Sequence, residues 1–478
     1  MSNEKGIQAA TPPSLAGVKR VYFVGIGGIG MSALARYFHA KGVTVSGYDK
    51  TETPLTKALI KEGIAVHYTE DLTVIPKDVD LVVYTPAVPT EHTELNFFKD
   101  NAYTVVKRSD VLGAITNQTF NICVAGTHGK TTISTMIAHV LRHSGYGCNA
   151  FLGGISTNYN TNFWSSEKEV AVIEADEYDR SFLKLAPDVA VISAVDADHL
   201  DIYGNEAAMQ DAFVQFGNKL KAGGVLFHKF GLKRMGDLKS LRKQTYSATN
   251  DAASVYVQNI EIADGGYRFD VQLPDAAITG FELAMGGLHN VENAVAAIAV
   301  AKYLKIEDEK IKAAIAAFKG VKRRFEYIIP PQKEKTGAHK QPIFIDDYAH
   351  HPEELKALLK STRSLFPQRR ITVIFQPHLF SRTKDFANGF SDSLSIADTI
   401  LLLPIYPARE LPVEGVTSAL IEKNMDRNKV CVLSKDELLT WAFEKVWDKE
   451  FGEVIITAGA GDIDALVQPL KKSIENKN

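Results

Sequence analysis

A run of seven residues, Gly126-Thr127-His128-Gly129-Lys130-Thr131-Thr132, most constrains how this chain can fold. An apolar stretch from Phe120 to Ala125 leads into it and is typical of a buried strand. The segment from Thr131 to His143 has apolar residues at helical spacing, and Gly145 stands where a helix would end. A strand, a glycine turn and a helix in this order place backbone N–H groups and a lysine where they can bind phosphate.

The spacing of this run departs from the usual nucleotide-binding loop. That loop has a glycine five positions before the second glycine, and Val124 stands at that position here. The plain alternative is an ordinary strand-to-helix turn that contains a lysine. We favour phosphate binding because glycine, lysine and threonine all occupy the functional places between the strand and the helix.

A second glycine-rich turn lies about 100 residues earlier. A strand ending at Val24 runs into Gly25-Ile26-Gly27-Gly28-Ile29-Gly30, and a helix is expected over Met31–Ala40. The next strand ends in Asp49, 19 residues after Gly30. This is the dinucleotide-binding fingerprint, in which glycines let the backbone approach a diphosphate and an acidic residue holds a ribose hydroxyl. An NAD-dependent oxidoreductase would need only this turn and a simple ATPase only the other. The pair therefore predicts two nucleotide-type ligands on separate domains.

Carboxylates follow two later apolar runs. The first run leads into Glu174-Ala175-Asp176-Glu177-Tyr178-Asp179 and the second into Asp196-Ala197-Asp198-His199-Leu200-Asp201. Parallel strands end at one edge of their sheet, so both clusters are expected to face the phosphates held by the lysine loop. A single aspartate here would more often be solvated, but Mg²⁺ takes a hydroxyl, one or two carboxylates and phosphate oxygens as ligands. Two clusters after the lysine loop therefore indicate a magnesium site.

Polar residues also gather near the ends of later elements. An Ala-rich helix opens at His289-Asn290-Val291-Glu292-Asn293, with the two asparagines on one face. Beyond a polar loop over Pro330–Pro342, four apolar strands end in histidine, arginine, tyrosine or glycine. A lone histidine at any of these ends would more often be structural, and the clustering is what indicates the ligand edge of another doubly wound sheet.

Composition narrows the class of protein. A chain of 478 residues with 45% hydrophobic and 23% charged residues is expected to form two to four globular domains. The net charge of −3 does not favour binding to nucleic acid. The sequence has no run of about 18 apolar residues, so no membrane span is predicted. Cys123, Cys148 and Cys431 lack metal-type spacing, which suits a reducing cytoplasm and argues against disulfides or a zinc site.

Together these motifs resemble the Mur ligase family, ATP-dependent amide-forming enzymes of peptidoglycan precursor synthesis. The similarity runs in family order from about Arg20 to the C-terminal helix and rests on G-T-H-G-K-T-T, E-A-D-E-x-D, D-A-D-H-x-D, H-N-x-x-N, R-R-F and D-D-Y-A-H-H-P. The motifs Q-P-H-x-x-x-R-T, I-Y-P-A-R-E and G-A-G-D-I are similar to the branch that adds L-alanine to UDP-N-acetylmuramate. Many relatives carry arginine where this chain has Leu379.

The resemblance implies a role for each matching residue. Binding of ATP is implied for Gly126, Thr127, His128, Gly129, Lys130, Thr131, Thr132, His289, Asn290, Asn293 and Arg324. Ligation of Mg²⁺ is implied for Thr131, Glu174 and His199. Binding of the UDP-sugar is implied for Gly27, Gly28, Gly30, Asp49 and His67, and binding of the incoming L-alanine for Tyr348, His350 and Arg382. The residues implied to be catalytic are Lys130, His199, His350 and Arg382.

The resemblance also implies an α/β fold of three domains. These are an N-terminal Rossmann-like UDP-binding domain over 1–118, a central P-loop-type ATPase domain with a mostly parallel sheet over 119–326, and a C-terminal Rossmann-like amino-acid-binding domain over 327–478. The expected protein is a cytoplasmic ligase, monomeric or weakly dimeric, that uses ATP and Mg²⁺. It would convert the lactyl carboxylate of UDP-N-acetylmuramate to an acyl phosphate, attach L-alanine, and release ADP and phosphate for cell wall biogenesis.

Two other functions remain open at this point. A ligase of cell-wall recycling that attaches a whole tripeptide shares D-D-Y-A-H-H-P, although it lacks the I-Y-P-A-R-E and G-A-G-D-I signatures. A non-catalytic UDP-sugar sensor could keep the fold, but it would be expected to have lost Lys130, Glu174 or His199, and all three are present.

Overall fold

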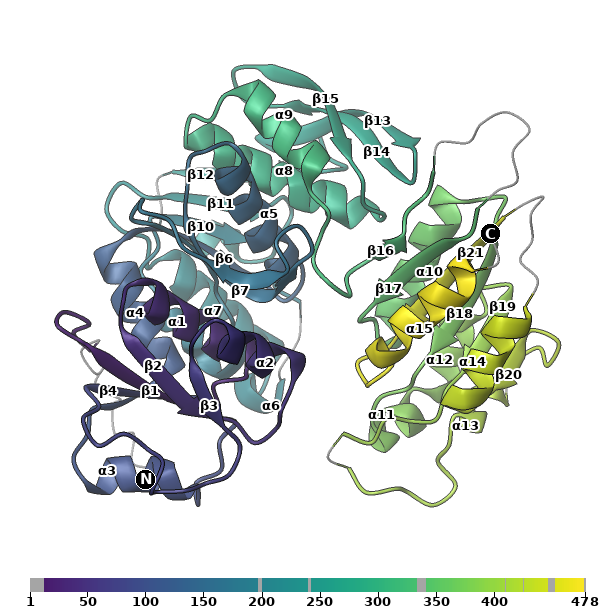
Figure 1. The fold of residues 1–478 in the computed structure, drawn as a ribbon. Helices are drawn as coiled ribbons and strands as arrows, with labels where there is room; N and C mark the ends of the chain where they lie inside the picture. Colours follow the sequence, from purple (N-terminus) through teal and green to yellow (C-terminus); the bar gives the residue numbers. More distant parts are fainter. Residues whose placement is uncertain are drawn as a thin grey trace, which may run out of the picture. The chain divides into compact units, whose positions relative to one another are not determined.

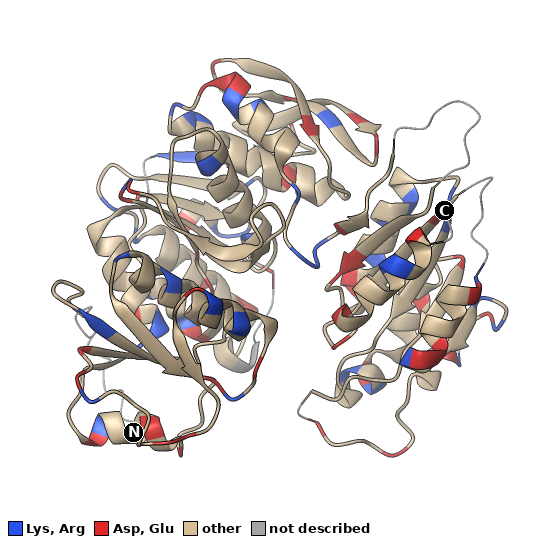
Figure 2. Cartoon of the chain, viewed as in Figure 1, with Lys and Arg blue, Asp and Glu red and all other residues tan. Residues whose placement is uncertain are grey.

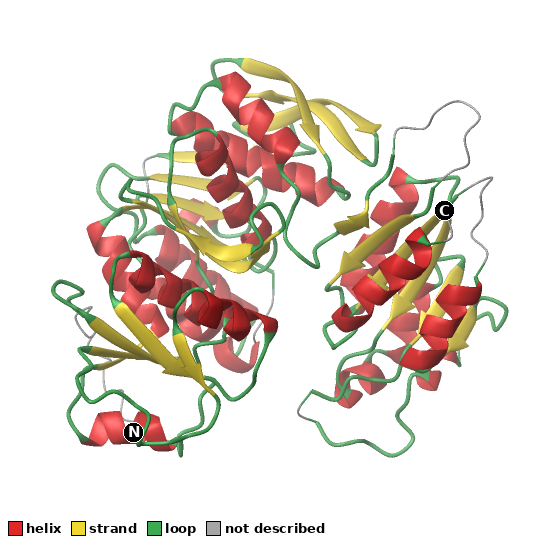
Figure 3. Cartoon of the chain, in the orientation of Figure 1, coloured by secondary structure: helices red, strands yellow, loops and turns green. Residues whose placement is uncertain are grey.

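The computed structural model describes residues 13–196, 200–239, 242–332, 341–408, 410–423, 425–445 and 452–476 (Figure 1). The described chain forms two compact units. The first comprises Met1–Ile155, Asn160–Tyr256 and Asn293–Ala314, and the second comprises Ser156–Tyr159, Val257–Glu292 and Ile315–Asn478. Strands gather in three sheets, each flanked by helices (Figure 3). The fold is thus the three-domain α/β architecture that was expected.

The N-terminal sheet is parallel and has the strand order β3-β2-β1-β4-β5. Its strands are β1 (Arg20–Val24), β2 (Thr44–Tyr48), β3 (Ala65–His67), β4 (Leu81–Tyr84) and β5 (Val105–Lys107). Its helices are α1 (Ile29–Ala40), α2 (Pro54–Lys61), α3 (Thr93–Asp100) and α4 (Arg108–Gln118). The strand order reverses direction at β1, and ligands of such sheets bind beyond the carboxyl ends of the strands at this point.

The central sheet carries the lysine loop. In the first unit its strands follow the order β12-β11-β10-β6-β9-β7-β8, and the first two residues of β13, Val255 and Tyr256, pair with β12. The pairs from β13 to β7 are parallel. These strands are β6 (Phe120–Ala125), β7 (Asn149–Ser156), β8 (Thr161–Trp164), β9 (Val170–Glu174), β10 (Val189–Ile192), β11 (Val225–Lys229), β12 (Lys243–Ser247) and β13 (Val255–Ala263). The sheet is mixed, because β14 (Gly266–Gln272) and β15 (Ala277–Leu283) form an antiparallel pair in the second unit.

Helices of this region follow the strands in sequence. They are α5 (Lys130–His143), α6 (Leu200–Tyr203), α7 (Glu206–Gly217), α8 (Leu288–Tyr303) and α9 (Asp308–Ala317), with short 3₁₀ segments over Tyr178–Lys184 and Met235–Asp237. Strand β6 lies between β9 and β10 and is buried on both faces, with Ile122, Cys123 and Val124 at 0% exposure. The loop that follows β6 is therefore held at the middle of the sheet.

The C-terminal sheet has the order β16-β17-β21-β18-β19-β20. Its strands are β16 (Glu326–Ile329), β17 (Ile343–Asp347), β18 (Arg370–Phe375), β19 (Thr399–Leu402), β20 (Val430–Val432) and β21 (Glu453–Ala458). Its helices are α10 (Pro352–Leu365), α11 (Phe380–Asp385), α12 (Ala387–Leu394), α13 (Ala419–Glu422), α14 (Lys435–Glu444) and α15 (Asp464–Glu475). Strand β16 is antiparallel to β17 and the other pairs are parallel, so the sheet is mixed and wider than the four strands that the sequence indicated.

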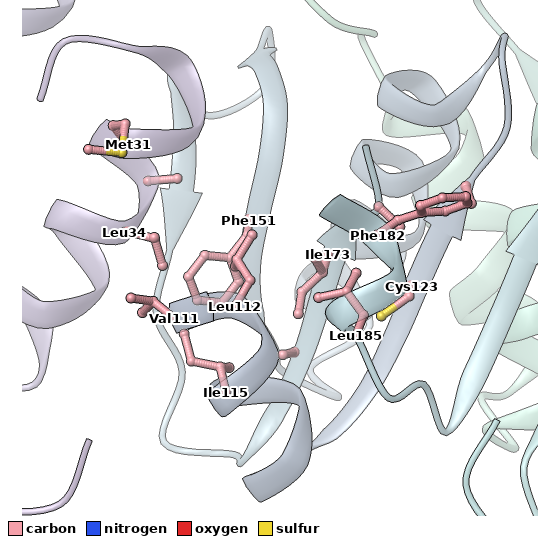
Figure 4. Close-up of a cluster of buried hydrophobic side chains, with 14 of the residues drawn as sticks. Met31, Leu34, Val111, Leu112, Ile115, Cys123, Phe151, Ile173, Phe182 and Leu185 are labelled. Atoms are coloured by element: carbon pink, nitrogen blue, oxygen red, sulfur yellow. The ribbon is translucent and has the colours of Figure 1, made fainter. Parts of the chain in front are cut away.

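One hydrophobic core joins the N-terminal sheet to the central sheet within the first unit. It includes Leu34 of α1, Leu112 of α4, and Phe151 and Ile173 of the central sheet (Figure 4). A buried polar contact reinforces it, because the side-chain amide of Asn162 (0% exposed) donates to the Ser32 hydroxyl at 3.0 Å. The two nucleotide-type turns therefore lie on one packed body. Basic and acidic side chains are interspersed over the chain (Figure 2), and no helix in the described ranges is long and apolar enough to cross a bilayer.

Candidate functional site

The lysine loop connects β6 to α5 and requires glycine at two positions. Gly126 has φ 138°, and a Cβ atom there would lie 2.2 Å from the hydroxyl of Ser193. Gly129 precedes α5 in the left-handed region (φ 83°), and a Cβ atom there would lie 2.9 Å from Oδ1 of Asn293. Side chains at either position would be strained and crowded. The neighbouring residues Ser193 and Asn293 therefore require glycine at both positions of the loop that leads into the first turn of α5.

Lys130 is the first residue of α5, and its ammonium group is held across the loop. Its Nζ atom donates to the Gly126 carbonyl at 2.7 Å and to Oε1 of Glu177 at 2.7 Å. Burial raises the pKa of the Glu177 carboxyl, while the charge of Lys130 and its hydrogen bond oppose that shift. The lysine is thus oriented in advance, at the mouth of a loop of phosphate-binding geometry.

Thr131 and Glu174 place two hard oxygen donors beside this lysine. The Thr131 hydroxyl donates to Oε1 of Glu174 at 2.9 Å, and Oε2 of Glu174 accepts from the Gly153 backbone N–H at 2.9 Å. A hydroxyl and a carboxylate next to a phosphate loop are ligands suited to Mg²⁺. Among the described residues no three His, Cys, Asp or Glu side chains cluster as a metal site. His199 lies outside the described residues.

The other residues of the lysine loop are anchored to the strand end after β10. The Thr127 N–H donates to the Ala194 carbonyl at 3.1 Å, and the Thr127 hydroxyl accepts from the Asp196 N–H at 3.2 Å. His128 is exposed, with its Nε2 atom 3.9 Å from Oδ2 of Asp196. Thr132 is 6% exposed inside the first turn of α5.

The N-terminal glycine turn uses two of its glycines to make room for side chains. The Gly27 N–H donates to Oδ2 of Asp49 at 2.7 Å, and a Cβ atom on Gly27 would lie 2.8 Å from that oxygen. A Cβ atom on Gly30 would lie 2.2 Å from Nη1 of Arg108. Gly28 caps α1 without a side-chain hydrogen bond. The turn thus leaves backbone N–H groups at the start of α1, with Asp49 on one side and Arg108 on the other.

His67 ends β3 in a partly buried polar network. Its Nε2 atom lies 2.8 Å from Oε1 of Glu94 and 3.3 Å from the Tyr22 hydroxyl, which donates to Oε2 of Glu94 at 2.5 Å. Burial alone would raise the pKa of Glu94, but the hydrogen bonds from His67 and Tyr22 hold it below its usual value. The ring of His67 is therefore oriented at the carboxyl edge of the N-terminal sheet.

Helix α8 begins with the predicted asparagine pair. Asn290 donates its side-chain amide to the Gly286 carbonyl at 2.7 Å, and His289 lies against Gly287. Asn293 lies against Gly129, so the fold brings it to the lysine loop. In the second unit Arg324 is exposed, whereas its neighbour Arg323 donates to the carbonyls of Gly459 and Gly461.

A cluster of polar side chains lies at the carboxyl edge of the C-terminal sheet. The rings of Tyr348 and His350 are 5.2 Å apart, and the rings of His350 and His378 are 6.0 Å apart. Burial lowers the pKa of both histidines, and the nearby guanidinium of Arg382 adds to the effect. Leu379 precedes α11 with φ 70°, a backbone conformation that is strained for a residue other than glycine.

Three buried atoms of this cluster have no hydrogen-bond partner among the described residues: Oε1 of Gln376, Nδ1 of His378 and Nη1 of Arg382. An unsatisfied buried polar atom costs about 1–3 kcal/mol, so three around one strand end are best explained by a polar ligand that pairs with them. The sequence had marked Arg382 but gave Gln376 and His378 no role. Their signal was the polar run directly after β18.

Comparison with known proteins gives consistent matches along the chain. The Mur ligase family catalytic domain matches residues 20–119, the Mur ligase middle domain matches 124–301, and the glutamate ligase domain of Mur ligases matches 323–461. A UDP-N-acetylmuramate–L-alanine ligase of Porphyromonas gingivalis is 48% identical over 96% of this chain and 99% of its own length. A protein of the same name from Cytophaga hutchinsonii is 46% identical over 97% and 98%.

Solved structures agree with the fold. The UDP-N-acetylmuramate–alanine ligase of Thermotoga maritima has a TM-score of 0.79 at 26% identity, covering 96% of this chain and 100% of its own. A murein peptide ligase of Psychrobacter arcticus has a TM-score of 0.63 at 24% identity, covering 96% and 99%. The second similarity bears on the fold alone.

Proposed function

The chain belongs to the Mur ligase family, and we propose that it joins L-alanine to the lactyl carboxylate of UDP-N-acetylmuramate in an ATP-dependent reaction of peptidoglycan synthesis. The observation that carries this proposal is the lysine loop with its two oxygen donors, Thr131 and Glu174, beside an oriented Lys130. Full-length similarity to ligases that add L-alanine supports the choice of substrates.

The first chemical step is phosphoryl transfer. ATP supplies the γ-phosphoryl group that turns the substrate carboxylate into an acyl phosphate, with ADP as the leaving group. Carboxylate and triphosphate are both anionic, so they repel one another unless positive charge lies between them. Lys130 supplies such a charge, and the N–H groups at the start of α5 add oriented donors.

The residues around Glu174 fit a magnesium ion. Thr131 and Glu174 would hold it, and His199 is proposed as a further ligand. When bound, Mg²⁺ neutralises charge on the transferred phosphoryl group. Glu174 is kept in place by the Gly153 N–H, and that contact fixes the direction of its carboxylate.

The second step joins the amine to the acyl carbon and releases phosphate. We assign the binding of L-alanine to the C-terminal cluster, where Arg382 pairs with the alanine carboxylate and Tyr348 and His350 border the amine. Gln376 and His378 add the acceptor and ring nitrogen that have no partner among the described residues. A zwitterionic amino acid offers both donors and acceptors to such a set.

The remaining assignments of binding residues are proposals of the same kind. The UDP-sugar binds at Gly27, Gly28, Gly30, Asp49 and His67, and ATP binds at the lysine loop, His289, Asn290, Asn293 and Arg324. Domain boundaries near residues 118 and 326 separate the three binding regions. The protein acts in the cytoplasm as a monomer or weak homodimer, and its three free thiols suit that compartment.

One experiment tests the proposed reaction. Phosphate release is measured with ATP, Mg²⁺ and UDP-N-acetylmuramate against L-alanine, glycine, L-serine and the recycled tripeptide. Release that depends on both UDP-N-acetylmuramate and L-alanine is the expected result. Activity with the tripeptide alone would move the protein to the recycling ligases, and no release with any acceptor would contradict a ligase function.

A further inference from the structure

A small cavity lies between the N-terminal glycine turn and the magnesium-type carboxylate. It has a volume of about 170 Å³, and both Gly30 and Glu174 belong to its lining. Its apolar wall includes Leu112 of α4 and Phe151 and Ile173 of the central sheet, which pack together in the core of the first unit (Figure 4). The cavity therefore lies where a substrate would have to extend from the glycine turn toward the lysine loop.

The cationic group in this cavity is the guanidinium of Arg108. Arg108 is the first residue of α4, and its side chain is 25% exposed. Across the described part of the chain its one ionic partner is Asp176, with 3.5 Å between Nη2 and Oδ2. A guanidinium has five N–H donors, so a single ion pair at that distance leaves most of its binding capacity for a ligand.

The local backbone is arranged to keep this guanidinium beside the glycine turn. Glycine at position 30 is what permits the contact, because a Cβ atom there would lie 2.2 Å from Nη1 and 3.1 Å from Cζ of Arg108. The first turn of α1 contains no acidic residue, so the positive end of the helix dipole lies in the same region. Arg108 and the start of α1 thus border one space.

Asp176 is the counter-charge that the ligand would replace. Its Oδ1 atom accepts from the Tyr178 N–H at 3.1 Å, and its side chain is 40% exposed. The aspartate therefore keeps a partner of its own when Arg108 leaves it. An exchange of partners leaves no buried charge uncompensated.

We propose that Arg108 binds an anionic oxygen group of the nucleotide sugar, exchanging Asp176 for it, and so directs the substrate from the glycine turn toward Glu174. This inference rests on the proposed function, because the ligand is taken to be a UDP-sugar. Two anionic groups of UDP-N-acetylmuramate have the required chemistry, the diphosphate and the lactyl carboxylate. A purely structural ion pair between Arg108 and Asp176 is the alternative.

The test measures binding, which does not depend on turnover. Dissociation constants for UDP, UDP-N-acetylglucosamine and UDP-N-acetylmuramate are compared by calorimetry in the wild type, Arg108→Ala and Arg108→Lys. Loss of a charge-assisted contact is expected to weaken UDP-N-acetylmuramate by about 10- to 100-fold in Arg108→Ala. Lysine is expected to restore part of the loss. Lys107→Ala, an exposed neighbour, is the matched control and should change none of the constants.

The three ligands identify the anionic group. Equal weakening of all three points to the diphosphate, whereas weakening confined to UDP-N-acetylmuramate points to the lactyl carboxylate, since the other two lack it. Unchanged affinity for all three, with only a lower melting temperature, would overturn the inference. That outcome would not contradict the proposed reaction. Conversely, a wild-type protein without alanine-dependent phosphate release would contradict the proposed reaction but would not change the result of these titrations.

A second variant moves the guanidinium without removing its charge. Gly30→Ala adds the Cβ atom that collides with Nη1, at a helical position where alanine is well tolerated. If Gly30→Ala acts through Arg108, it weakens UDP-N-acetylmuramate in the wild-type background and adds little in Arg108→Ala. Fully additive losses would show that alanine obstructs the ligand directly, and would count against the positioning role.

Discussion

Nζ of Lys130 lies 2.7 Å from Oε1 of Glu177, and the side chains of the pair are only 15% and 1% exposed. The lysine begins α5, while the glutamate follows β9 on the neighbouring strand, so the pair ties the phosphate loop to the strand end beside it. The ammonium group of Lys130 is therefore already oriented before phosphate binds, and it would contact both the phosphate and Glu177.

Replacing Lys130 by alanine should lower the rate of ADP formation by at least about 10²–10³-fold, because the cation facing the transferred phosphoryl group is lost. The variant should also unfold more easily, since removing one partner of a buried ion pair costs about 3–5 kcal/mol. Calorimetric melting and ADP release measure the two effects. The double variant Lys130→Met with Glu177→Gln should recover stability but not activity; turnover near the wild-type rate in either variant would remove Lys130 from its role.

Glu174→Gln should raise the Mg²⁺ concentration needed for half-maximal activity by about tenfold or more, because a neutral amide is a poorer ligand than a carboxylate. Gly153→Ala should act in the same direction, since its Cβ atom would lie 2.3 Å from Oε2 of Glu174. Magnesium titrations of ADP release measure this, with exposed Glu167→Gln as the control. An unchanged magnesium requirement in both variants would show that Glu174 is not a ligand.

Arg382→Ala should raise the KM for L-alanine by about 10- to 100-fold and leave the KM for ATP near its wild-type value, because a hydrogen bond to a charged group contributes about 1.5–3 kcal/mol. Lys384→Ala, an exposed cation on the same helix, should not change either constant. Initial rates over a series of alanine concentrations decide the outcome. Equal changes in the two KM values would mean that the substitution disturbs the structure in general and that Arg382 does not bind L-alanine specifically.

Asp346 should make the C-terminal sheet less stable at high pH. Burial raises the pKa of this carboxyl from 3.8 to about 7, although the Thr457 hydroxyl donates to it at 2.6 Å. A raised pKa means that the folded state favours the protonated carboxyl. Its contribution to the free energy of unfolding is therefore fully present below the pKa of the unfolded chain, and it is lost as the pH rises toward 7. Over that range the loss should be on the order of 1–4 kcal/mol.

Hydrogen–deuterium exchange of peptides from β17 and β21 at pH 5 and pH 8, corrected for intrinsic rates, measures this local stability. Asp346→Asn should show a smaller difference between the two pH values than the wild type. A wild-type protein whose corrected protection rises between pH 5 and pH 8 would contradict the assignment.

Much of the fold could be predicted from local patterns. Apolar spacing predicted a helix over Thr131–His143, and α5 spans Lys130–His143, because a buried helix face leaves a clear period in the sequence. The three-residue strand β3 has no such period in the sequence, and no strand was predicted there. Three residues are too few to show a period, and only pairing with β2 makes them a strand.

The candidate site was less predictable where contacts join distant segments. Motif spacing marked Lys130, Thr131 and Glu174, and the fold places Thr131 against Glu174, a contact that no spacing could give. Arg108 had no local signal, since its meeting with Gly30 depends on the order of β1, β4 and β5 in the sheet. That Gln376 and His378 each have a buried polar atom without a partner among the described residues is likewise a result of three-dimensional placement.

The absence of a side chain at position 30 limits which substitutions can be accepted there during evolution. Gly30 and Arg108 are 78 positions apart, yet the guanidinium occupies the volume that any larger residue at position 30 would need. The two residues are therefore expected to be inherited as a pair. Lineages that shorten the arginine become free to accept alanine or serine at the glycine, whereas lineages that acquire a side chain there first must displace the arginine. The last glycine of the fingerprint would then be preserved by its neighbour in space as much as by the ligand.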